Sequence, residues 1–155
     1  MLALTQFVDS LSAPKSEQPL RICFVTPELT QFHLNGGIGT AVSGLIEALN
    51  AAGHQISVLY TGWAPAKDEP EGNHPRWYSG LRTLQSSNIN VDFVSRLYEQ
   101  RFLYSSRHVS YACYDYLKPT PFDVIHFVDY GGCGYYSCLA KRCGAAFARS
   151  TLVTT

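Results

Sequence analysis

Short apolar runs alternate with helical segments along most of this chain, and this alternation restricts its fold more than any other feature. Residues 21–26 (RICFVT) form a short run of the kind that fills a strand buried on both faces of a parallel sheet. Residues 36–53 have helical periodicity, and residues 55–60 (QISVLY) read as a second strand. Strand, helix and strand joined by short connections form a right-handed parallel unit. The sequence therefore predicts a β-α-β unit at the start of the fold.

The predicted helix over 36–53 has an apolar stripe that should face the sheet. Gly53 is suited to end this helix, because glycine readily takes the left-handed conformation that follows a helix. The stripe consists of Ile38, Ala41, Val42, Leu45 and Leu49.

The alternation continues to the end of the sequence. After a loop at 61–76, the pattern predicts helices at 77–85, 101–117 and 131–144 and strands at 89–94, 122–127 and 151–155. The second of these helices has a stripe of Phe102, Val109, Cys113 and Tyr116 or Leu117, and the third has one of Tyr135, Leu139, Ala140 and Cys143. We therefore expect an α/β fold, a Rossmann-like parallel sheet with helices on both faces, over residues 21–155. Residues 1–20 are predicted to be an N-terminal arm and linker.

Composition supports one packed domain and excludes several partners. Hydrophobic residues make up 46% of 155, which is enough for a core, and the 12 basic residues balance the 12 acidic ones. A balanced charge gives no electrostatic reason to expect nucleic acid or an anionic membrane as partner. No apolar run approaches the roughly 18 residues of a transmembrane segment, and Asp9 makes the N-terminus a poor secretory signal.

The five cysteines fit no zinc pattern, and their number is odd. We expect them to be reduced and to act as small hydrophobic residues, which favours a cytoplasmic location.

The first candidate for chemistry is the glycine-rich segment Asn35-Gly36-Gly37-Ile38-Gly39, between the first strand and the first helix. Ligands of open α/β sheets bind outside the carboxyl ends of the strands, where this segment is predicted to lie. Glycines let a ligand approach the backbone, and a helix N-terminus attracts phosphate through its unpaired amides. The alternative is a turn whose glycines only allow close packing of helix on sheet. The sequence leaves both interpretations open.

A dinucleotide-binding site agrees less well with these glycines. Its fingerprint follows the strand directly, whereas nine residues separate Thr26 from Gly36. Val42 stands where the third glycine is required, and the second strand ends in Tyr60-Thr61-Gly62 without a carboxylate for the ribose. A nucleotide-dependent oxidoreductase is therefore disfavoured.

The second candidate is the segment that follows the predicted strand at 122–127. Strand alternation places His126 and Val128 on one face and Asp129 at the strand tip. Asp129 could accept hydrogen bonds from sugar hydroxyls or cap the next helix, and His126 alone reads as a neutral core histidine bonded to backbone. Glu28 is the only other acidic residue expected at this rim. The sequence has no evident Ser-His-Asp signature, metal-ligand cluster or paired-carboxylate motif.

Taken together, these segments resemble the start of glycosyltransferase family 4 proteins, and glycogen and starch synthases begin similarly. The resemblance is carried by residues 21–28, by the glycine segment through Thr40, and by residues 48–54 (ALNAAGH). Residues 122–130 are similar to the family's strand that ends in an "HDW" element, here Val128-Asp129-Tyr130. The synthases have a lysine before the double glycine, where this chain has Leu34 and Asn35. The resemblance extends over residues 21–155.

The resemblance implies a GT-B fold, in which two Rossmann-like domains face each other across the active site. It implies transfer of a sugar from a nucleoside-diphosphate sugar to a glycan or small-molecule acceptor, with retention at the anomeric carbon and usually without a metal ion or other cofactor. The Gly36-Gly37 loop would lie near the donor diphosphate, and Asp129, with His126 beside it, near the transferred sugar or the acceptor. Residues 21–155 correspond to only part of the N-terminal domain, so we expect no transferase activity from this polypeptide alone.

One further alternative is a non-catalytic interaction module. An open sheet edge and an uncovered apolar face favour self-association or partner binding.

Overall fold

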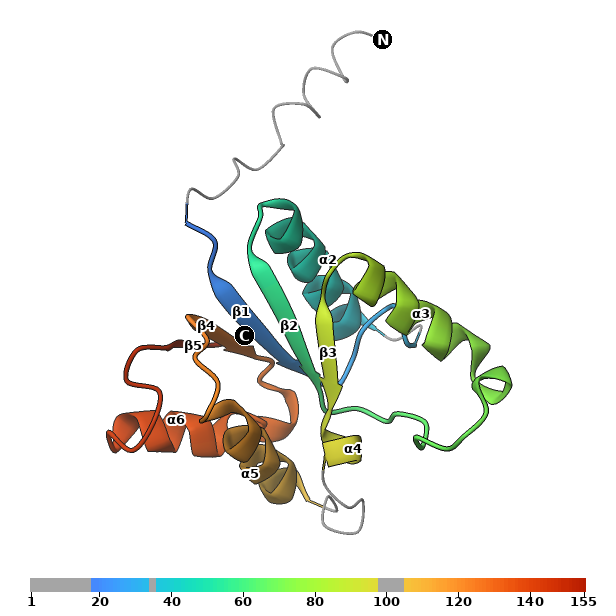
Figure 1. The fold of residues 1–155 in the computed structure, drawn as a ribbon. Coiled ribbons are helices and arrows are strands. Elements are labelled where there is room, and N and C mark those ends of the chain that lie inside the picture. The colour runs from blue at the N-terminus through green and yellow to red at the C-terminus, as the bar shows by residue number, and fades with distance from the viewer. Residues whose placement is uncertain (1–17, 34–35, 98–104) are drawn as a thin grey trace, which may run out of the picture.

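The computed structural model describes residues 18–33, 36–97 and 105–155. Their five strands form one parallel sheet in the order β3-β2-β1-β4-β5, which confirms the expected α/β Rossmann-like class (Figure 1). The strands are β1 (Arg21–Thr26), β2 (Gln55–Tyr60), β3 (Asn90–Phe93), β4 (Val124–Phe127) and β5 (Thr151–Thr154). The helices are α2 (Gly37–Ala51), α3 (Pro75–Ser86), α4 (Val94–Leu97), α5 (Ser106–Leu117) and α6 (Tyr135–Arg142), with 3-10 turns η1 (Glu71–Asn73) and η3 (Tyr130–Gly132).

Helices cover both faces of the sheet, and strand alternation sends neighbouring side chains to opposite cores. Phe24 of β1 joins the core beneath α2 and α3, together with Ile46 and Trp77. Val25, the next residue, joins the core on the other face with Leu117 of α5. Figure 1 shows α2 and α3 on one side of the strands and α5 and α6 on the other. Both faces of β1 are therefore buried, as its apolar run predicts.

The predicted stripe of α2 is partly wrong. Ala41 and Leu45 are exposed, and Leu45 retains 40% of its accessible surface. The helix instead buries Gly39, Val42, Ser43 and Ile46. The buried face includes the polar Ser43, whose hydroxyl hydrogen-bonds to the loop after β1 and which the apolar periodicity therefore did not mark. Gly53 follows the helix with a φ of 92°, as expected of its left-handed stop.

The last predicted helix is shorter than expected, and of its predicted stripe only Ala140 packs against the core. It begins at Tyr135 rather than at 131, because Gly131 and Gly132 have left-handed φ angles of 78° and 64° that interrupt a regular helix. Tyr135, Leu139 and Cys143 are exposed, while Ser137 is the buried residue of α6.

The helix predicted over 101–117 is observed from Ser106 onward, and Phe102 lies outside the described residues. Cys113 and Leu117 are buried as predicted. The short helix α4 was not predicted: it begins at Val94, where the sequence suggested that strand continued.

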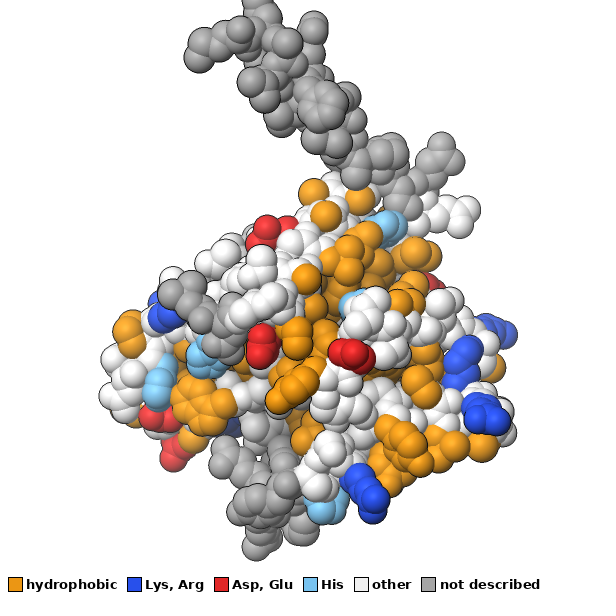
Figure 2. All heavy atoms as spheres, turned by 180° about the vertical axis from the view of Figure 1, so that it is seen from behind, with side chains coloured by type: hydrophobic (Ala, Val, Ile, Leu, Met, Phe, Trp, Pro, Cys, Tyr) orange, Lys and Arg blue, Asp and Glu red, His pale blue; other side chains and the backbone are white. Residues whose placement is uncertain are grey.

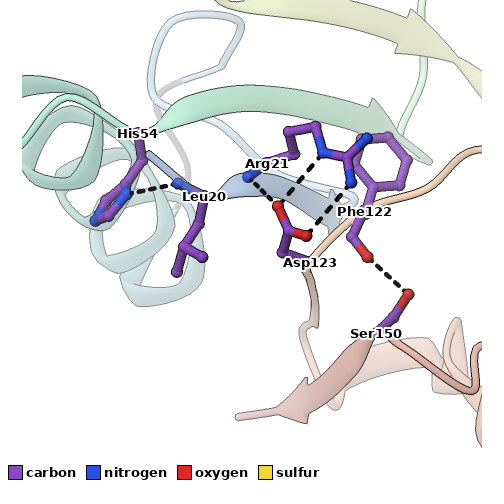
Figure 3. Close-up of polar contacts among 6 residues, drawn as sticks. All are labelled: Leu20, Arg21, His54, Phe122, Asp123 and Ser150. Atoms are coloured by element: carbon purple, nitrogen blue, oxygen red, sulfur yellow. Dashed lines mark hydrogen bonds and ion pairs between the residues drawn. The ribbon is translucent and has the colours of Figure 1, made fainter. Parts of the chain in front are cut away.

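Polar contacts fix the amino ends of the strands (Figure 3). The Arg21 backbone N–H donates to Asp123 Oδ2 at 2.8 Å, and the Arg21 guanidinium pairs with the same carboxylate. His54 Nδ1 accepts from the Leu20 N–H at 3.2 Å, and Ser150 Oγ donates to the Phe122 carbonyl at 2.7 Å. These bonds connect β1, β2, β4 and β5 at the amino ends of the strands.

The view from behind shows hydrophobic side chains exposed through the middle of that face (Figure 2). None of the helices in the described ranges is long and apolar enough to cross a membrane.

Candidate functional site

The sheet order creates one place where two successive connections leave in opposite directions. From β1 the chain passes through α2 to β2 on one side, and from β4 it passes through α6 to β5 on the other. β1 and β4 are hydrogen-bonded neighbours, with Val25 opposite Phe127. The carboxyl ends of such a pair border the crevice in which open α/β sheets bind ligands. Both segments singled out in the sequence begin at this crevice.

The loop from β1 to α2 is anchored by its apolar residues. Leu29 and Phe32 each retain only 1% of their accessible surface. The Phe32 ring stacks on Trp77 of α3 with a centroid distance of 4.9 Å, and it meets Tyr60 edge-on at the same distance. The described part of this loop, residues 27–33, is thus held in place against α3 and β2 by Leu29 and Phe32.

Polar contacts that the sequence analysis missed hold the same loop against two helices. Ser43 Oγ accepts from the Thr30 N–H at 3.1 Å and lies 3.0 Å from Gln31 Oε1. Gly80 of α3 lies so close to the Gln31 carbonyl that an added Cβ would be 2.1 Å from its oxygen. No sequence motif marks Ser43 or Gly80, because their roles depend on contacts distant in sequence.

The glycines at the start of α2 serve two different structural roles. An added Cβ at Gly39 would contact Glu28, 3.4 Å from its Cβ and 3.7 Å from Oε2, so this glycine permits close packing. Added Cβ atoms at Gly36 or Gly37 would have no described atom within 4 Å, so the backbone there borders open space. Gly36 occupies the N-cap position, where no described side chain caps the helix. The amides of the first turn are therefore accessible to a ligand from the side of Gly36 and Gly37.

The other members of the predicted phosphate segment differ in position. Ile38 is half-buried and packs against the core, so only its backbone could serve a ligand. Asn35 lies outside the described residues. Glu28 approaches the helix start, where a carboxylate complements the positive end of the helix and weakens its attraction for another anion. Its charge, after burial, is also a cause of the raised pKa of Tyr60, about 12.

Asp129 lies at the tip of β4 with its side chain exposed. Its backbone N–H donates to the Thr155 carbonyl at 2.8 Å, which fixes the position of the residue. Although it occupies the N-cap position of η3, its carboxylate makes no cap bond. The carboxylate is therefore presented to solvent at the crevice.

His126 lies inside the sheet rather than at its rim. It retains 7% of its accessible surface, and its ring lies 5.1 Å from that of Phe24. Nε2 lies 3.0 Å from Thr155 Oγ1, a hydroxyl partner in place of the expected backbone one, and Nδ1 has no partner among the described residues. Burial lowers the pKa of His126, which favours the neutral ring.

The described cysteines and acidic residues are not arranged as a metal centre. Within the described ranges, no three His, Cys, Asp or Glu side chains are grouped so that they could hold a metal ion. Cys23, Cys113 and Cys133 are buried, while Cys138 and Cys143 are exposed on and after α6, contrary to a uniform role as small core residues. A hydrogen bond with Cys113 is the main cause that lowers the pKa of the Cys133 thiol to about 7.

Comparison with known protein families gives a match over most of the chain. The family model of the starch synthase catalytic domain matches residues 21–155, from the start of β1 through β5. No curated protein and no solved structure matches the chain. The match confirms the expected likeness to starch and glycogen synthases, while membership of family 4 stays a prediction. Because the match covers far more than half of the chain, this protein belongs to the starch synthase catalytic domain family of glycosyltransferases.

Proposed function

We propose that this chain forms the N-terminal wall of the active site of a retaining GT-B glycosyltransferase. Such an enzyme transfers a hexosyl group from a nucleoside-diphosphate sugar to a glycan or small-molecule acceptor. One observation carries the proposal: the uncapped start of α2 and the exposed Asp129 both follow strands that end at the crevice between β1 and β4. A leaving diphosphate and the sugar it releases need an anion site and a polar group beside each other.

The start of α2 is suited to the leaving group. Departure of the diphosphate concentrates negative charge on its oxygens, and fixed amide dipoles stabilise that charge without reorganising. Open backbone at Gly36 and Gly37 lets phosphate oxygens approach the first-turn amides, to which Asn35 and Ile38 would add their own. Gly39 would offer only its backbone to the phosphates, because its missing side chain leaves room for Glu28.

We assign Asp129 to the transferred sugar or the acceptor, since an exposed carboxylate can accept hydrogen bonds from sugar hydroxyls. His126 would not contact the sugar. It would position the end of β4 through its contact with Thr155. We expect no metal ion in the reaction, because the amides of α2 take the role of the countercharge. We also expect the 155-residue polypeptide to be inactive alone, since its described residues supply only one wall of a two-domain site.

Nuclear magnetic resonance of the ¹⁵N-labelled chain, titrated with ADP or UDP, tests the proposal. We expect the largest shifts at the amides of Gly36, Gly37 and Ile38. A Gly37→Glu substitution places a carboxylate in the open space at the helix start and should abolish these shifts. Gly44→Glu is the matched control, because Gly44 is an exposed glycine of the same helix that also borders open space. Equal binding by both variants would show that the start of α2 is not the diphosphate site.

A non-catalytic interaction module is the alternative. It is supported by large exposed hydrophobic side chains on α5 and α6, among them Tyr111, Tyr135 and Leu139, and by β5 as an edge strand. Sedimentation velocity distinguishes it, because self-association through this surface would raise the sedimentation coefficient with concentration and be suppressed by Leu139→Lys. A concentration-independent monomer argues against it.

A further inference from the structure

A pocket lies between the start of α5 and the chain that connects η3 to α6. It has a volume of about 580 Å³. Ser106, Arg107 and Ser110 line it from α5, and the left-handed glycines Gly131 and Gly132 line it from η3. Tyr135 and Tyr136 complete its wall at the beginning of α6. None of the sequence motifs discussed above includes the α5 residues.

Contacts between α5, α6 and the end of β4 hold the walls of this pocket in place and leave its interior free. Ser110 Oγ, which is buried, accepts from the Tyr136 N–H at 3.1 Å and so joins α5 to α6. The rings of Tyr111 and Tyr136 meet perpendicularly at 5.7 Å. At Gly134 an added Cβ would be 2.9 Å from the Phe127 ring, so the connection is pressed onto the end of β4. The pocket is thus a formed feature of the fold.

Among the described residues that line the pocket, Arg107 is the only charged one, and none is a carboxylate. Arg107 is exposed and forms no hydrogen bond or ion pair within the ranges that the structure describes. An arginine side chain that no described carboxylate occupies suits a phosphate group, which it binds through two parallel hydrogen bonds. The hydroxyl of Ser106 can add a further donor.

The aromatic side of the pocket suits a different part of a ligand. Tyr135 retains 61% of its accessible surface, and its ring meets that of Tyr136 at 80° and 5.1 Å. A tyrosine offers an apolar ring face together with a hydroxyl. The C–H faces and hydroxyl edges of a saccharide match that combination. The pocket therefore combines a site for an anion with a surface for a sugar ring.

We propose that this pocket binds a saccharide that carries a phosphate group, with the phosphate on Arg107 and the sugar ring against Tyr135. Resting on the proposed function, the inference identifies this ligand as the acceptor. Its position supports that role, because Gly131 and Gly132 follow Asp129 by two and three residues, so a bound saccharide would lie next to the assigned transfer site.

Isothermal titration of the 155-residue chain with glucose 6-phosphate, glucose, maltose and inorganic phosphate tests the inference. We expect glucose 6-phosphate to bind more tightly than the other three. Arg107→Gln should weaken its binding at least about tenfold, the expected effect of losing hydrogen bonds to a charged group. Arg149→Gln, an exposed arginine outside the pocket, is the control and should bind like the unchanged chain. Circular dichroism checks that both variants are folded.

The outcomes separate this inference from the proposed function. If maltose or inorganic phosphate binds as tightly as glucose 6-phosphate, or if Arg107→Gln binds normally, the inference is wrong whatever the result with ADP and UDP. If glucose 6-phosphate binds through Arg107 while the nucleotides do not shift the Gly36 and Gly37 amides, the pocket stands and its assignment as acceptor site fails with the proposed function.

Discussion

Replacement of Gly80 by alanine tests how the wall of the crevice is held in place. Gly80 lies in α3 where that helix meets the loop from β1 to α2. A Cβ at this position would be 2.1 Å from the Gln31 carbonyl oxygen and 2.6 Å from its carbon. Real Cβ contacts essentially never fall below 3.0 Å, so helix and loop must separate by about 1 Å. The partner is backbone, which cannot rotate away.

The expected loss of stability combines two opposing effects. Overpacking of this kind costs about 1–3 kcal/mol, and we take the upper end because the obstruction is a carbonyl and because Phe32 stacks on Trp77 at the same contact. Alanine favours a helix over glycine by about 1 kcal/mol. The net destabilisation is therefore about 2 kcal/mol, which lowers Tm by about 4–8 °C in a domain of this size.

Urea unfolding followed by circular dichroism measures this change, and Gly44→Ala is its matched control. Gly44 lies in the exposed middle of α2, where an added Cβ has no described atom within 4 Å. That substitution should stabilise the protein by about 0.5–1 kcal/mol through helix propensity alone. If Gly80→Ala stabilises the protein as well, α3 does not press on the loop, and our explanation of how the crevice is held is refuted.

Three more predictions concern the same edge of the sheet. Ser43→Ala should cost about 1–3 kcal/mol in urea unfolding, because it leaves the partly buried Thr30 N–H unbonded, whereas an unchanged midpoint would contradict this role. Gly131→Ala should cost about 1–2 kcal/mol, because alanine is strained at a φ of 78°, and an unchanged Tm would exclude that conformation. Burial lowers the pKa of His126, so at acidic pH the unfolded chain binds a proton more readily than the folded protein does. The free energy of unfolding should therefore fall as pH drops below about 6.5. His126→Gln should reduce this dependence, measured as Tm against pH, and an unchanged profile would show that His126 is not its source.

The strands were the most predictable part of this fold. Residues 21–26 and 55–60 are observed with the predicted bounds, because a strand buried on both faces must be apolar along its length. The buried face of α2 was only partly predictable, since it includes the polar Ser43, which bonds to a loop thirteen residues away in sequence. The start of α6 was missed for a related reason: the pattern includes Gly131 and Gly132, but whether a glycine ends a helix depends on its φ angle.

The candidate site was predictable in its location and unpredictable in its detail. Strand order alone places the glycine segment and Asp129 at carboxyl ends, and the structure makes those two strands neighbours. The sequence left two interpretations of the glycines open, phosphate approach and close packing. Close packing applies to Gly39, which meets Glu28, whereas Gly36 and Gly37 border open space, where phosphate approach stays a prediction. Arg107 had no signal, because a helix surface arginine is common and only its position beside η3 distinguishes it.

The two ends of the sheet differ in how their polar groups are used. At the amino ends, Arg21, Asp123 and Ser150 are hydrogen-bonded to neighbouring segments (Figure 3). At the carboxyl ends, the amides at the start of α2, the Asp129 carboxylate and the Arg107 guanidinium have no described side-chain partner. Because these positive and negative groups are unpaired, they add little to the stability of the fold. In the functions proposed above, the amides of α2 bind the donor diphosphate, Asp129 the transferred sugar and Arg107 the phosphate of the acceptor, so each unpaired group has a separate part of the reaction to serve.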